Sequence, residues 1–209
     1  MHSQLWGMHS NSSWLFKKYA APAFHDGQRV LEIGPDSFPS TYEQLASKPH
    51  EPWELIDLFD RPNLTYRATT PYAYPIPDNR FDVVLSGSVM EHIPAPWNWI
   101  KEVARVCKPG GSVITIIPVS WPFHEYPVDC WRAYPDGMRA LYAEAGLEVT
   151  TCVCESLEAR KYPRHVPGRT PGWWMRRPLK LAYRLLGRLG LRVECAYDTI
   201  TIGRKPSRD

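Results

Sequence analysis

The chain has 209 residues, and its sequence predicts an α/β fold with a doubly wound sheet in a single domain. Three observations lead to this fold class. Short apolar segments of strand length alternate along the chain with segments of helical pattern. Two of these segments, 81–86 and 112–117, are almost entirely apolar, as in strands buried on both faces of a parallel sheet. The length lies near the top of the single-domain range, and the chain contains no internal repeat.

The expected elements follow from local signals. A helical lead-in at 13–20 lies within an N-terminal segment of 28 residues, and the first strand, 29–33, ends at Gly34. Ser40 and Glu43 form a capping box, which predicts the start of a helix. Gly146 is placed to end another helix. The further expected strands are 53–57, 64–68, 81–86, 112–117, 147–153 and 193–202, the further helices are 97–107 and 135–145, and a turn is expected at 109–111.

Composition narrows the class of protein. Apolar residues make up 44% and charged residues 22%, values that exclude a disordered chain. The five cysteines include no CxxC pair, so reduced thiols are expected rather than a disulfide framework. No apolar run reaches the roughly 18 to 20 residues of a membrane span, and the first residues lack the pattern of a signal peptide. A cytoplasmic protein is therefore expected.

Charge is distributed unevenly. Residues 1–154 hold 12 basic and 17 acidic residues, whereas 155–192 hold ten basic residues and two acidic ones. Such an asymmetry usually marks a surface that faces a partner. The expectation is an acidic body with one basic helical insertion before the last strand.

The ends of the predicted strands supply candidate ligand-binding residues, because ligands of open α/β sheets bind outside the carboxyl ends of the strands. Gly34 lets a ligand approach the backbone closely. The residues after it lack the second and third glycines of a dinucleotide fingerprint, and no phosphate-binding P-loop is present. Asp57 stands 23 residues after Gly34, close to the spacing at which an acid binds ribose hydroxyls. A nucleoside-like ligand without phosphates fits this pattern, and a solvent-exposed carboxylate at the strand end is the alternative for Asp57.

Four segments in register resemble class I S-adenosylmethionine (SAM)-dependent methyltransferases. They are RVLEIG at 29–34, PIPDNRFDVV at 75–84, EHI at 91–93 and KPGG at 108–111. The resemblance covers about residues 28–154. It implies a Rossmann-like sheet of seven strands, mostly parallel with an antiparallel last strand, and SAM as the cofactor.

The resemblance also implies roles for individual residues. Glu32 and Gly34 would line the methionine end of the cofactor, and Asp57 would bind the ribose. Ser86, Ser88 and the start of the Glu91-His92 turn would flank the sulfonium. The sequence departs from the family pattern by its single glycine and by the absence of an acid just before Pro75, where Tyr72 could stack on adenine instead. For Glu91 and His92, a purely structural role at the start of a helix is the alternative.

The loop at 121–132 carries the candidates for acceptor binding. Its aromatic and polar residues suit a polar ring such as a sugar, and the substrate-binding candidates are Trp121, Tyr126, Asp129, Trp131 and Arg132. A lid packed on the sheet, with Arg132 paired to Asp129, is the alternative. Transfer to a hydroxyl needs a base, for which the candidates are His124, then His92, then Glu125. Glu125 and Asp129 could also bind a divalent cation, although two acids are too few to define a metal site.

These features predict a SAM-dependent methyltransferase that acts on a hydroxyl of a polar acceptor, such as a sugar or another small metabolite. In the basic segment, Lys180, Arg184 and Arg188 share one face of a predicted helix that begins after Pro178. That helix could simply dock on the sheet, or bind an anionic acceptor, a membrane surface or RNA. The alternative functions are therefore an RNA or membrane-associated methyltransferase, or a non-catalytic scaffold with the same fold.

Overall fold

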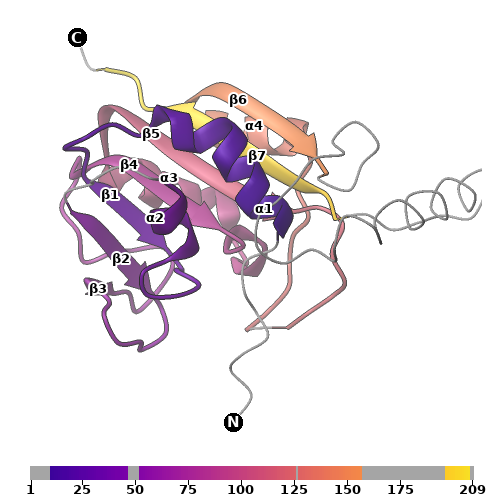
Figure 1. Ribbon diagram of the computed structural model, residues 1–209, viewed down its shortest axis with the longest axis horizontal. Coiled ribbons are helices and arrows are strands. Elements are labelled where there is room, and N and C mark those ends of the chain that lie inside the picture. The colour runs from indigo at the N-terminus through magenta and orange to yellow at the C-terminus, as the bar shows by residue number, and fades with distance from the viewer. Residues whose placement is uncertain (1–9, 47–51, 126, 157–195, 208–209) are drawn as a thin grey trace, which may run out of the picture.

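The computed structural model describes residues 10–46, 52–125, 127–156 and 196–207. These residues form one sheet flanked by helices (Figure 1). The strands are β1 (Val30–Ile33), β2 (Trp53–Asp57), β3 (Tyr66–Arg67), β4 (Phe81–Gly87), β5 (Cys107–Pro118), β6 (Glu148–Glu155) and β7 (Asp198–Arg204). The helices are α1 (Ser10–Leu15), α2 (Thr41–Ala46), α3 (Pro96–Val106) and α4 (Pro135–Glu144), with short turns η1 (Phe16–Ala20), η2 (Ala21–Ala23) and η3 (Met90–His92).

The seven strands of the sheet lie in the order β3-β2-β1-β4-β5-β7-β6. Strands β1 to β5 pair in parallel with their neighbours, whereas β7 runs antiparallel to both β5 and β6. The strand order reverses between β1 and β4, and the carboxyl ends there form the switch point at which ligands of such sheets bind. The expected Rossmann-like sheet with an antiparallel last strand is confirmed.

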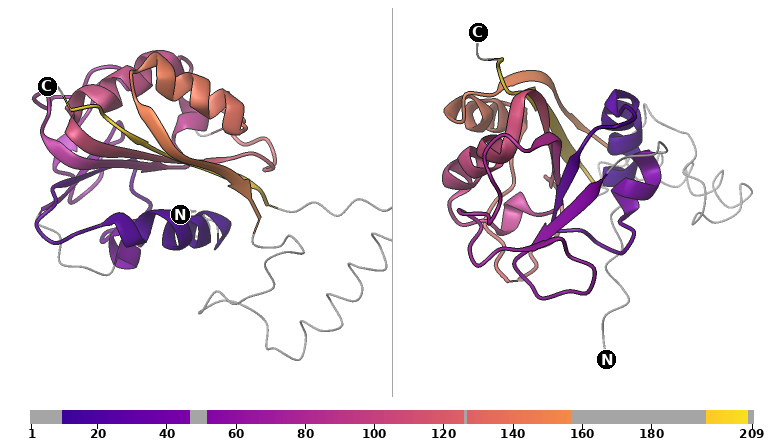
Figure 2. Two further views of the ribbon diagram at one scale, coloured as in Figure 1. Left: turned by 90° about the horizontal axis from the view of Figure 1, so that it is seen from above. Right: turned by 90° about the vertical axis from the view of Figure 1, so that its left-hand side faces the viewer.

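Helices cover both faces of the sheet (Figure 2). On one face α3 and α4 enclose a core that contains Trp99 and Tyr142, and on the other α1, η1 and α2 enclose a core around Phe16 and Phe24. The alternating pattern of β1 explains the two layers: Leu31 and Ile33 point into the first core and Val30 into the second.

The predicted start of α2 is confirmed in detail. Ser40 Oγ accepts a hydrogen bond from the Glu43 backbone N–H at 3.0 Å, and Glu43 Oε2 accepts one from the Ser40 N–H at 3.3 Å. These reciprocal bonds are those of a capping box. They fix the direction in which the chain leaves the loop after β1.

The expected turn at 109–111 is instead part of a long strand. β5 extends back to Cys107, and its register against β4 shifts between Phe81 and Val83. The extra residues of β5 pair across to the end of the chain, where Gly110 N–H donates to Lys205 O and Lys205 N–H donates to Gly111 O. A long-range pairing that the local sequence does not show therefore replaces the turn.

The remaining differences lie near the ends of the chain. The lead-in begins at Ser10, earlier than expected, and continues as η1 and η2. β7 begins at Asp198 and runs to Arg204. Most of the basic segment, including its predicted helix after Pro178, lies outside the described residues. In the part of the chain that the structure describes, no helix combines the length and the apolar character needed to cross a membrane.

Candidate active site

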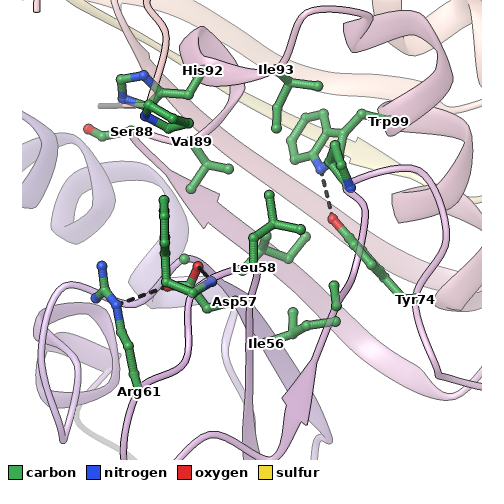
Figure 3. Close-up of a pocket in the computed structure, with 16 residues that line it drawn as sticks. Ile56, Asp57, Leu58, Arg61, Tyr74, Ser88, Val89, His92, Ile93 and Trp99 are labelled. Carbon is green, nitrogen blue, oxygen red and sulfur yellow. Dashed lines mark hydrogen bonds and ion pairs between the residues drawn. The ribbon is translucent and has the colours of Figure 1, made fainter. Parts of the chain in front are cut away.

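A cavity of about 180 Å³ lies at the carboxyl edge of the sheet, where the loops after β1, β2 and β4 meet (Figure 3). Residues from these three loops line it together with side chains from the 68–74 segment and α3. The lining residues on which the site depends are Gly34, Asp57, Tyr74, Ser88, His92 and Trp99. The cavity thus occupies the position at which the strand order predicts a ligand.

Gly34 brings the loops after β1 and β4 into close contact. Its φ is +67°, and a Cβ atom added to it would lie 2.5 Å from Val89 Cγ2. Only glycine satisfies both conditions, because L-residues are strained at this φ and the space is already filled. The single glycine kept from the family pattern is therefore the one on which this wall of the cavity depends.

Asp57 lies at the end of β2 and is 8% exposed. Its Oδ1 accepts a hydrogen bond from the Phe59 N–H at 3.1 Å, and its Oδ2 lies 3.2 Å from Arg61 Nε. Arg61 also donates from Nη1 to Pro35 O at 2.7 Å, which ties the loop after β2 to the loop after β1. The carboxylate that was expected to bind a ribose does face the cavity.

The far wall of the cavity is aromatic. Trp99 Nε1 donates a hydrogen bond to Tyr74 Oη at 2.8 Å, and both side chains are buried (Figure 3). Tyr72, the residue expected to stack on adenine, is not among the lining residues. Its Oη instead accepts a hydrogen bond from the Ala95 N–H at 3.1 Å, at the start of α3. Tyr74 lines the wall where the sequence suggested Tyr72.

Glu32 also lies away from the cavity. Its carboxyl group is 2% exposed and accepts hydrogen bonds from Ser40 Oγ and from Trp53 Nε1, the latter at 2.7 Å. Burial raises the pKa of Glu32 to about 8. In this structure Glu32 joins β1 to the capped start of α2 and to β2, and Gly34 alone of the two methionine-end candidates lines the cavity.

The two serines near the end of β4 have different surroundings. Ser88 follows the strand and lines the cavity with a φ of +54°, and its N–H donates to Ile116 O at 2.9 Å. Ser86 lies within β4 and is buried, and its Oγ has no hydrogen-bond partner among the described residues. Strained backbone and unpaired buried polar atoms both gather at functional sites. They mark this end of β4 as the most polar part of the site.

Glu91, His92 and His124 form a cluster next to the cavity, which we call the histidine cluster. One potential ligand atom from each side chain lies within 4.8 Å of the other two. His92 Nε2 is 3.9 Å from Glu91 Oε1, and the rings of His92 and His124 meet edge to face at 5.0 Å. Glu91 is completely buried, and neither of its carboxyl oxygens has a hydrogen-bond partner among the residues that the structure describes. Desolvation raises the pKa of Glu91 to about 8. Desolvation also lowers the pKa of His92, which favours a neutral ring.

The loop that carries His124 is held by hydrogen bonds to η3. The N–H groups of Cys130 and Trp131 donate to Glu91 O at 2.7 and 3.3 Å, and Trp131 Nε1 donates to Ile93 O at 2.9 Å. Asp129 accepts the His124 N–H at 2.9 Å. These contacts, between residues about 40 positions apart in the sequence, bring His124 next to His92.

Asp129 and Arg132 pair with each other in this loop. Arg132 Nη2 lies 2.7 Å from Asp129 Oδ2 and Nη1 binds Oδ1, and this bidentate bond lowers the pKa of Asp129 to about 2. Arg132 also donates to the carbonyl oxygens of Trp121 and Pro122. The ion pair fixes the shape of the loop, as the alternative of a packed lid predicts.

The other acceptor candidates are distributed around the loop. Glu125 is exposed, and neither it nor Asp129 belongs to the group of potential metal ligands found among the described residues. Trp131 is 37% exposed and meets Trp97 edge to face at 6.0 Å. Trp121 is half-buried, and Tyr126 lies outside the described residues.

Three site residues were not predicted from the sequence. Tyr74 and Trp99 form the aromatic wall, and Arg61 pairs with Asp57. Glu91 was expected near the sulfonium, but its place in a cluster with His92 and His124 was not. For Tyr74 and Trp99 the local sequence gives no signal, because their contact depends on the packing of α3.

Comparisons with known proteins show a methyltransferase domain in this chain. Residues 33–115 match the family model of a methyltransferase domain, which ends before the His124 loop. An uncharacterized methyltransferase of Mycobacteroides abscessus is 35% identical over 97 residues, which is 46% of this chain and 34% of that protein. The chain therefore spans about a third of the length of this relative.

Solved structures show the same fold. A chain of the complex between the Haloferax volcanii Trm112 methyltransferase activator and a methyltransferase superposes with a TM-score of 0.61 at 19% identity, covering 95% of this chain and 91% of the other. The Haemonchus contortus phosphoethanolamine N-methyltransferase 2, solved in complex with SAM, gives a TM-score of 0.56 at 15% identity, covering 94% and 52%. At these identities the likeness concerns the fold.

Proposed function

We propose that this chain, which belongs to the class I SAM-dependent methyltransferases, transfers a methyl group from SAM to a hydroxyl of a small polar acceptor. The observation that carries the proposal is the cavity at the switch point, with Gly34 and Asp57 on one side and the histidine cluster on the other. When bound, SAM supplies a methyl group activated on a sulfonium.

The residues on the first side suit the nucleoside part of this cofactor. Asp57 offers a buried carboxylate for ribose hydroxyls, and Gly34 allows the loops after β1 and β4 to pack together at this wall of the cavity. Tyr74 and Trp99 give the cavity an apolar wall. A cationic, phosphate-free cofactor also agrees with a site that has acids and no P-loop.

The residues on the second side suit the acceptor. Ser88 and His92 line the cavity near the end of β4, and Trp131 and Trp97 are partly exposed aromatic side chains that meet edge to face. A sugar or another polyhydroxylated metabolite fits such a combination of aromatic and polar groups. The proton of the acceptor hydroxyl leaves at the histidine cluster, where His124 and His92 are the candidate bases. Positioning supplies much of the remaining acceleration.

Calorimetry with S-adenosylhomocysteine tests cofactor binding. We expect one site per chain and a loss of about 10- to 100-fold in affinity for Asp57→Ala, because hydrogen bonds to a charged group contribute about 1.5–3 kcal/mol. Asp60→Ala is the matched control, since Asp60 lies on the same loop with its side chain 81% exposed. A lack of binding by the unmodified chain would favour the non-catalytic alternative, and equal effects of both variants would refute the role of Asp57.

The acceptor class is tested separately by mass spectrometry. The chain is incubated with SAM and a panel of glycosides, amines and RNA, and products that gain one methylene are sought. We expect methylated glycosides or related alcohols. Methylated RNA alone would favour the alternative in which the basic 155–192 segment binds nucleic acid.

A further inference from the structure

We infer that the histidine cluster binds a divalent first-row transition-metal ion through Glu91, His92 and His124. The inference deepens the proposed function, on which it rests for the chemistry of the acceptor but not for the binding of the ion. Two imidazoles and one carboxylate favour ions such as Zn²⁺, Co²⁺ or Mn²⁺ over the all-oxygen sites that Mg²⁺ and Ca²⁺ prefer.

The spacing of the three side chains suits one ion. Their potential ligand atoms lie within 4.8 Å of one another, and His92 Nε2 is 3.9 Å from Glu91 Oε1. Ligand atoms that share an ion at about 2.0–2.2 Å lie roughly 3–3.5 Å apart in a tetrahedral site. Rotamer adjustments of about 1 Å would therefore bring the cluster to ligand distances.

The state of Glu91 points to a ligand independently of this spacing. Its side chain is completely buried, and neither carboxyl oxygen has a hydrogen-bond partner among the described residues. A buried carboxyl group without partners costs free energy, and buried charges in proteins are usually paired or bound to a metal. Arg132, a cation that acts electrostatically on Glu91, is itself held in a bidentate pair with Asp129. A bound cation would compensate the Glu91 carboxylate.

The contacts around the two imidazoles are those of metal ligands. His92 Nδ1 faces the carbonyl oxygen of Val128, to which it can only donate, so Nε2 carries the lone pair on the side of Glu91. His124 Nδ1 lies 3.2 Å from Pro122 O and 3.3 Å from Asp129 Oδ2, two further acceptors. Histidines that bind metals usually donate their other ring N–H to a carbonyl or carboxylate in this way.

The position of the ion would explain how an acceptor hydroxyl is activated. His92 lines the cavity, so an ion on the cluster would face the acceptor side of the site. A metal with an open position binds the acceptor oxygen and lowers the pKa of its hydroxyl, and the proton is lost to solvent. The oxygen then attacks the methyl carbon as the carbon–sulfur bond breaks. In this arrangement His92 and His124 act as ligands, and the metal replaces a histidine base.

Titration of the chelator-treated full chain with Co²⁺ tests the inference without any turnover. We expect one Co²⁺ per chain, with the visible absorption of a site that contains imidazole ligands. His124→Ala and Glu91→Gln should each weaken binding at least about 10-fold, since even outer-shell partners of metal ligands contribute 10–100-fold. His25→Ala, which removes an exposed histidine far from the cluster, should bind Co²⁺ as the unmodified chain does.

Thermal unfolding followed by circular dichroism verifies that the variants are folded. If Glu91→Gln does not fold, His124→Ala, which alters only a loop, is the variant on which Co²⁺ binding is measured. Absence of the Co²⁺ spectrum, or a spectrum that persists unchanged in folded His124→Ala, would overturn the inference. Binding of S-adenosylhomocysteine without Co²⁺ binding would refute the metal site alone. Co²⁺ binding without S-adenosylhomocysteine binding would instead refute the proposed function and leave the metal site intact.

Discussion

Two glutamates of this protein, Glu32 in β1 and Glu91 in η3, are buried to the same degree but have opposite surroundings. Their exposed fractions are 2% and 0%, and desolvation raises the pKa of each to about 8. Glu32 accepts hydrogen bonds from Ser40 and Trp53, whereas neither oxygen of Glu91 has a hydrogen-bond partner in the part of the chain that the structure describes. Burial and a raised pKa are thus common to both residues, and it is the hydrogen bonds that differ between them.

The same contrast separates the two sides of the site. The β1 side is built from backbone geometry and from the hydrogen bonds that cap α2 and join Glu32 to Ser40 and Trp53. The histidine cluster brings together η3 and a loop about 30 residues later, and it leaves polar atoms unpaired. We therefore expect changes near Glu32 to affect stability and changes near Glu91 to affect turnover.

The largest expected effect is on catalysis. Glu91→Gln should lower the rate of methyl transfer by about 10²-fold or more, because the change removes an ionisable carboxyl group from the site where the hydroxyl loses its proton. Glu32→Gln, the matched control, keeps an acceptor for Ser40 and Trp53 and should change the rate by less than about 3-fold. Single-turnover measurements with the acceptor found in the panel would distinguish the two variants. Similar losses in both would show that the contrast does not reflect function.

The next effect concerns stability and pH. The pKa of Glu32 is raised in the folded chain to about 8 from its ordinary value of 4.5, so folding favours the protonated form. The unfolded chain ionises first as pH rises, and the contribution of Glu32 to stability is full below pH 4.5 and is lost toward pH 8. Relative to Glu32→Gln, the unmodified chain should lose stability across this window, on the order of 1 kcal/mol per pH unit. Urea unfolding at several pH values measures the difference, and a constant difference would contradict the assigned protonation.

A smaller effect is expected from the backbone of the cavity wall. Gly34→Ala should destabilise the fold by about 2–3 kcal/mol, because the φ of +67° is strained for alanine and the new Cβ would lie 2.5 Å from Val89 Cγ2. Gly137→Ala is the control, since nothing lies within 4 Å of a Cβ there. In α4 that change should stabilise the chain slightly. Equal unfolding midpoints for the two variants would show that Gly34 does not hold the two loops together.

The smallest effect on the rate is expected at Glu125, in contrast to Glu91. Glu125 was the third candidate base, but it is exposed and outside the histidine cluster. Glu125→Gln should therefore leave the rate within about 3-fold of the unmodified chain, as surface substitutions usually do. If Glu125→Gln lowered the rate of methyl transfer as much as Glu91→Gln, Glu125 would be the better candidate for the base.

The fold was predictable because its signals are local. Apolar strands, the Ser40 capping box and Gly146 identify their elements without tertiary information. Where pairing is long-range the prediction was wrong: the expected turn at 109–111 became part of β5 through contacts with Lys205. Local sequence does not reveal a partner about 100 residues away.

The site was predictable to the extent that it depends on strand ends. Gly34, Asp57 and Ser88 line the cavity as expected, because register alone brings the ends of β1, β2 and β4 together. Glu32 and Tyr72 do not line the cavity, because their side chains point elsewhere. Glu32 binds Trp53, and Tyr72 binds the backbone at the start of α3. The histidine cluster could not be predicted, because it depends on hydrogen bonds between the 128–131 loop and η3. The hydrophobic pattern of the sequence gives no sign of these bonds.

A crystal structure of the complex with S-adenosylhomocysteine is the most direct test of the central claim, that one cavity holds cofactor and acceptor on its two sides. We predict ribose hydroxyls within hydrogen-bond distance of Asp57 and the sulfur atom directed toward Ser88 and the histidine cluster. Binding at another surface, or a sulfur atom directed away from Glu91, would contradict the assignment of the acceptor side.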